Sequence, residues 1–106
     1  MVSDVQAMLL AVLRDFRKAH GHAIGKQIEE RRGKPMGVGT LYKALHALER
    51  QGYVRGDWEE QPPAEYGRPR RRFYEPTGLG ETALQEYIEH SGQMIKLTRP
   101  RAQGVI

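Results

Sequence analysis

The sequence has no cysteine among its 106 residues, so it offers neither a disulfide framework nor a thiolate metal site. It has no apolar run close to the ~20 residues that a membrane-spanning helix needs. Its first residues place Asp4 ahead of a short apolar stretch, which is not typical of a secretory signal. These absences favour a cytoplasmic, nucleoid-associated protein without a membrane partner. The length favours one domain over residues 1–106.

The signatures of common enzyme classes are missing as well. The chain has no glycine-rich phosphate loop, no paired carboxylates in an apolar setting, and no catalytic triad or dyad in a recognisable local motif. Histidines stand at positions 20, 22, 46 and 90. His20 and His22 are too close together to supply a tetrahedral set, and no carboxylate cluster joins them. We therefore expect no catalysis, no metal and no cofactor.

Positive charge is what the sequence has in excess, with a formal net charge of +4. Its placement is most informative between residues 37 and 51. Apolar residues there recur at helical spacing and predict a core-facing stripe, made of Val38, Leu41, Leu45 and Leu48. The opposite face has no acid before Glu49 and consists of Thr40, Lys43, Ala44 and Ala47. A small and basic helix face is suited to the major groove of double-stranded DNA.

Three further helices are predicted around this segment, at about residues 4–18, 23–32 and 77–97. Ser3 or Asp4 is expected to cap the first helix and Thr77 the last. Gly21 is expected to break the chain between the first two helices, because glycine adopts positive φ readily. Residues 98–106 contain proline and glycine and are expected to form a flexible tail.

A β-hairpin is predicted at about residues 53–75. Residues 53–58 alternate as a strand with Val54 and Trp58 on one face, which favours core packing of Trp58 over a role in stacking on a ligand. Residues 61–67 contain two prolines and predict a loop, and residues 68–75 form the return strand. A helix-turn-helix at about 23–51 followed by this hairpin is a winged helix, a mainly α (α+β) fold.

Two groups of residues are predicted to contact DNA. In the helix, the group comprises Gly39, Thr40, Tyr42 and Lys43, near the N–H groups that favour a phosphate. For Tyr42, packing against the core is an equally good interpretation. In the wing, the group comprises Arg68, Arg70 and Arg72, because arginines in a hairpin can bridge phosphates or enter the minor groove. A hairpin that is merely solvated would have acidic residues among its basic ones, and no acid occurs from Gly67 to Tyr74.

The first and last helices have more apolar surface than one neighbouring helix requires. We expect this surface to form a two-fold dimer through Val5, Met8, Leu9, Leu84, Tyr87, Ile88 and Met94. The last helix would then be a C-terminal dimerisation helix.

The ordered motifs of the chain resemble the PadR family of bacterial winged-helix regulators. They comprise His20-Gly21, Gly39-Thr40-Leu41-Tyr42, Leu48-Glu49 with Gly52, Gly67-Arg68-Pro69-Arg70-Arg71-Arg72-Phe73-Tyr74, and Thr77 with Gly80. The resemblance implies a short member that represses transcription as a homodimer on an inverted-repeat operator. Two alternatives stay open: a winged-helix module that docks other proteins, and a sensor that binds small aromatic compounds at the dimer interface.

Overall fold

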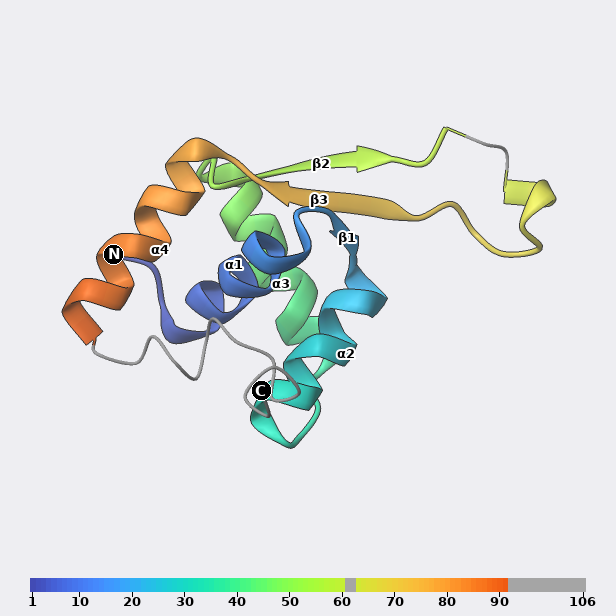
Figure 1. Cartoon of the computed structure of the whole chain (residues 1–106). Helices are drawn as coiled ribbons and strands as arrows, with labels where there is room; N and C mark the ends of the chain where they lie inside the picture. The colour runs from blue at the N-terminus through green and yellow to red at the C-terminus, as the bar shows by residue number, and fades with distance from the viewer. Residues whose placement is uncertain (61–62, 92–106) are drawn as a thin grey trace.

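The structure is a computed structural model and describes residues 1–60 and 63–91. The described residues form four α-helices, a short 3₁₀ helix and a three-stranded antiparallel sheet. In chain order the elements are α1 (Asp4–Phe16), β1 (Ala19–His20), α2 (Gly21–Arg32), α3 (Val38–Arg50), β2 (Val54–Trp58), η1 (Pro63–Glu65), β3 (Arg72–Pro76) and α4 (Gly78–Ser91). The hairpin of β2 and β3 extends well beyond the helices, and α4 lies at the opposite end of the molecule (Figure 1). The predicted winged-helix fold is confirmed.

Local signals explain most helix ends. The Ser3 hydroxyl accepts the N–H of Gln6, whose side chain accepts the N–H of Ser3 in return, which is a capping box. The Thr77 hydroxyl accepts the N–H of Gly80 and so caps α4, as predicted. Gly33 and Gly52 both have φ of +80°, the left-handed conformation that closes a helix and that glycine adopts without strain.

The connection between α1 and α2 differs from the prediction. Arg17, not Gly21, adopts positive φ, at 67°. Gly21 is the first residue of α2. It is buried under the ring of Tyr42, which can approach the backbone there because glycine has no Cβ. The residues just before it form β1, a strand that the sequence did not predict. Its two residues pair with β3, which makes β3 the central strand of the sheet.

The core lies between the helices and the inner face of the sheet. Leu41, Leu45 and Leu48 of α3 are buried as predicted. Two other predictions were wrong: Val38 is 71% exposed and Trp58 is 55% exposed. Val38 is the first residue of α3, so its side chain lies before the turn that reaches the core. Trp58 ends β2, where the hairpin has already left the helices (Figure 1).

The apolar stripes of α1 and α4 meet within a single chain. Four of the predicted dimerisation residues are buried there, namely Leu9, Leu84, Tyr87 and Ile88. The Tyr87 hydroxyl also donates to an Asp4 carboxylate oxygen at 2.6 Å and so ties the two helices together. The expectation that these four side chains face a partner subunit is therefore corrected: each stripe serves as the partner of the other. Val5 and Met8 are half-buried, and Met94 and the predicted tail lie outside the described residues.

Across residues 1–60 and 63–91, no helix combines the length and apolar character needed to cross a membrane.

Candidate nucleic-acid interface

The outer face of α3 is exposed and basic. Gly39, Thr40, Lys43 and His46 are all exposed along it. Lys43 forms no ion pair with any residue that the structure describes. Gly37 caps the helix without a side-chain hydrogen bond, which leaves the first N–H groups of α3 without a side-chain acceptor. Such N–H groups together with a nearby ammonium group form a typical site for a phosphate.

Tyr42 stands between this face and the core. Its side chain is half-buried, and a Cβ added to Gly21 would lie only 2.0 Å from its hydroxyl oxygen. The ring centroid lies 6.3 Å from that of His46, one turn further along α3. Tyr42 therefore packs across the start of α2 while one side of its ring stays accessible. Both interpretations of Tyr42 remain compatible with this position.

The register of the hairpin brings Arg72 against α3. Trp58 pairs with Arg72, and Gly56 with Tyr74, so these four residues lie on one face of the wing, which carries the side chains of Trp58, Arg72 and Tyr74. The guanidinium of Arg72 forms an ion pair with Glu49 of α3 and lies 5.5 Å from the ring centroid of Trp58. A Cβ at Gly56 would come within 2.7 Å of the Arg72 Nε, so a larger residue there would displace the guanidinium group. Arg72 thus joins the wing to α3.

Arg68 is held within the wing by Glu59. Its two terminal nitrogens lie 2.8 and 3.1 Å from the two carboxylate oxygens of Glu59, which also accepts the backbone N–H of Arg71 at 2.6 Å. The hydrogen bond from Arg68 is the main reason why the pKa of Glu59 falls to about 2. The return strand begins only at Arg72, so residues 68–71 do not alternate as a strand, contrary to the prediction.

Replacing Arg68 by alanine is expected to raise the pKa of Glu59 from about 2 toward 4.5, because the carboxylate loses its main hydrogen-bond donor. A lowered pKa stabilises the folded wing fully above pH ~4.5, and that contribution is lost as the pH falls toward 2. Carbon-13 NMR titration of the carboxyl group measures the shift. Arg70→Ala is the matched control and should leave this pKa unchanged. A Glu59 pKa that stays near 2 in Arg68→Ala would contradict the assignment.

Arg70 is the predicted wing arginine that remains available. It is exposed, and within the described part of the chain no carboxylate pairs with it. In the sequence, all three arginines lie in a segment without acids, Gly67 to Tyr74, and so were predicted to be available. The acids that pair with Arg68 and Arg72 are 9 and 23 residues away in the sequence.

A concave surface of about 300 Å³ connects the start of α2, the side of α3 and the wing. It is lined by His20, Gly21, His22, Tyr42, His46, Trp58, Arg70, Arg71, Arg72 and Tyr74, and no carboxylate contributes to it. His22 and His46 were not among the residues predicted to contact DNA. A signal for His46 was present, since it follows Lys43 by three residues on the same helix face. Burial is the main cause that lowers the pKa of His20, whose Nδ1 accepts the N–H of Ala23.

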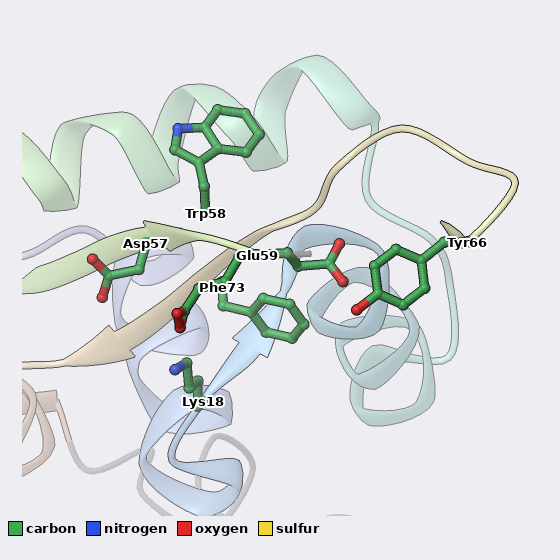
Figure 2. Close-up of a pocket in the computed structure, with 7 residues that line it drawn as sticks. Lys18, Asp57, Trp58, Glu59, Tyr66 and Phe73 are labelled. Carbon is green, nitrogen blue, oxygen red and sulfur yellow. The ribbon is translucent and has the colours of Figure 1, made fainter. Parts of the chain in front are cut away.

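A second pocket, of about 450 Å³, lies on the other side of the hairpin (Figure 2). It is lined by Lys18, Asp57, Trp58, Glu59, Glu60, Tyr66 and Phe73. Figure 2 shows the Trp58 indole directed away from Lys18 and Phe73, toward α3. The pocket therefore combines carboxylates with a lysine. No group of three or more metal-ligating side chains is found among the residues that the structure places.

Comparison with known proteins agrees with this architecture. The model of the transcriptional regulator PadR-like family matches residues 9–86. A PadR family transcriptional regulator from Eggerthella lenta is 26% identical, with 93% of this chain and 78% of that chain covered and a TM-score of 0.63. A transcriptional regulator from Clostridium thermocellum is 24% identical, with 87% of this chain and 86% of that chain covered and a TM-score of 0.72.

A third solved structure is that of Bacillus subtilis PadR in complex with operator DNA. It is 18% identical, with 80% of this chain and 46% of that chain covered and a TM-score of 0.68. No curated protein sequence matches the chain. Because the family model spans most of its residues, the protein belongs to the PadR-like family of transcriptional regulators, whose members are not enzymes.

Proposed function

We propose that the protein is a homodimeric repressor that binds an inverted-repeat operator in double-stranded DNA. The observation that carries the proposal is the exposed basic face of α3, with Lys43 unpaired among the described residues, beside an equally unpaired Arg70 in the wing. In this arrangement α3 enters the major groove, and the wing contacts the flanking backbone or minor groove. The likeness to the B. subtilis structure, which holds operator DNA, supports this placement. The protein would act on DNA in the cytoplasm.

Arg68 and Arg72 have a different part in this proposal. Each is held by a carboxylate and would stabilise the shape of the wing that presents Arg70. Each would contact a phosphate only if the phosphate replaced the carboxylate in its ion pair. Thr40 and the N–H groups of the first turn of α3, including that of Gly39, would hold a phosphate of the same strand as Lys43.

The dimer needs a surface other than the buried stripes of α1 and α4. Val5 and Met8 retain partial exposure on α1, and Leu79 at the start of α4 is 58% exposed. A two-fold contact over the outer sides of these helices would lie at the end of the molecule opposite the wing (Figure 1). The two copies of α3 would then read half-sites one DNA turn apart, ~34 Å.

The proposal is tested by selecting bound sequences from a pool of random duplexes and measuring their affinity against salt. We expect an inverted repeat to be enriched, with log K falling linearly with log salt by ~0.9 for each phosphate contact. Light scattering of the free protein should give twice the mass of one chain. Recovery of proteins but of no duplex would favour a protein-docking module instead. A stable monomer at micromolar concentration would overturn the dimer.

A further inference from the structure

The first turn of α3 exposes an apolar side chain to solvent. Val38 is 71% exposed and has a glycine on each side in the sequence. A Cβ added to Gly39 would meet nothing within 4 Å, and one added to Gly37 would meet only the Thr40 hydroxyl, at 3.9 Å. The isopropyl group of Val38 therefore projects from a bare stretch of backbone that can approach another surface closely.

Folding does not explain the valine at this position. Apolar area stabilises a fold only when it leaves water, at ~25 cal/mol per Å², and Val38 keeps most of its area exposed. Valine also has lower helix propensity than alanine. The side chain would gain free energy only where another molecule covers it, and Val38 stands at the N-terminal end of α3, the part of a recognition helix that reaches the base edges when the helix enters the major groove as proposed.

The other side chains of this turn limit the kinds of contact that it can form with DNA bases. From Gly37 to Tyr42 there is no arginine, lysine, asparagine or glutamine, the residues that form paired hydrogen bonds with guanine or adenine. Thr40 and Lys43 supply hydrogen bonds, and Lys43 is suited to a phosphate. The apolar group that a base pair presents in the major groove is the 5-methyl group of thymine.

We propose that Val38 determines part of the sequence specificity by covering the 5-methyl group of one thymine in each half-site. This inference rests on the proposed function and deepens it, because it names a base and an atom that α3 reads. The contact is apolar, so it should be independent of salt, unlike the contacts of Lys43 and Arg70 with phosphates.

The test uses a duplex selected from the random pool, in which each thymine is replaced in turn by deoxyuridine, which lacks only the 5-methyl group. With the unaltered protein, we expect one position per half-site to weaken binding about fourfold, as the burial of one methyl-sized group predicts. In Val38→Ala the same replacement should change binding less than twofold. The dependence of log K on log salt should be the same for both proteins.

Phe16→Ala is the matched control, because Phe16 is also an exposed apolar residue of a helix, at the end of α1, and has no part in the proposed DNA and dimer contacts. It should retain the fourfold effect of deoxyuridine. Tolerance of deoxyuridine at every thymine would overturn the role of Val38, and so would an effect that persists in Val38→Ala. Either result would leave DNA binding itself intact. Failure to select any duplex would instead overturn the proposed function, and the role of Val38 with it.

Discussion

Replacing both Lys43 and Arg70 by alanine is expected to weaken binding to duplex DNA about 100-fold per protomer at ~0.1 M salt. Both side chains are exposed, and neither forms an ion pair with a residue that the structure describes. A hydrogen bond to a charged group contributes ~1.5–3 kcal/mol, so two lost bonds amount to ~3 kcal/mol or more. Each lost phosphate contact should also reduce the salt slope by ~0.9. Fluorescence anisotropy over a series of salt concentrations measures both quantities.

The double variant Arg17→Ala/Arg55→Ala is the matched control, because it removes the same charge elsewhere. Arg55 pairs with Glu75 on the face of the hairpin turned away from Arg72, and Arg17 lies beside the same glutamate. We expect this control to weaken DNA binding only a few-fold, because salt screens the attraction of DNA to distant charges. Equal losses in the two double variants would mean that net charge alone governs binding, and would contradict the placement of Lys43 and Arg70 at the DNA.

Gly80→Ala is expected to lower the free energy of unfolding by ~3 kcal/mol. Gly80 is buried in the first turn of α4, and an added Cβ would lie 2.0 Å from the carbonyl oxygen of Tyr53 and 2.9 Å from its carbonyl carbon. That oxygen accepts the N–H of Thr77 at 3.0 Å, so it cannot turn away without losing a hydrogen bond. Overpacking against side chains costs ~1–3 kcal/mol, and backbone atoms yield less easily than side chains do.

Urea unfolding followed by circular dichroism measures this loss. Gly78→Ala, two residues earlier in the same turn, is the matched control, because a Cβ there would meet nothing within 4 Å. It should be neutral or stabilise the protein by up to ~1 kcal/mol, since alanine restricts the unfolded chain. Equal stability of the two variants would show that Tyr53 does not confine Gly80.

The sequence by itself determined the features that depend on neighbouring residues. The spacing of Leu41, Leu45 and Leu48 placed the buried side of α3 correctly, because helical periodicity is a local property. Glycine at position 52 predicted the end of that helix, since a left-handed residue closes it. The winged-helix architecture and the PadR resemblance followed from the order of such signals along the chain.

Only the tertiary structure decided how far the core extends along each element. Periodicity placed Val38 and Trp58 in the core, but each stands at the end of its element and is exposed. Conversely, Leu9 and Leu84 were expected to face a second subunit, and they are buried because α1 and α4 cover each other. A pattern of apolar residues shows that a surface is to be covered, and does not show by what.

Tertiary structure also decided which basic side chains are available. The arginines of the wing look alike in sequence, yet Glu59 holds Arg68 and Glu49 holds Arg72, while Arg70 is exposed. The turn of the hairpin and the packing of α3 against it bring these carboxylates to their arginines. Such pairings are long-range, so no local pattern encodes them, and of these three wing arginines they leave only Arg70 without an ion pair to a described residue.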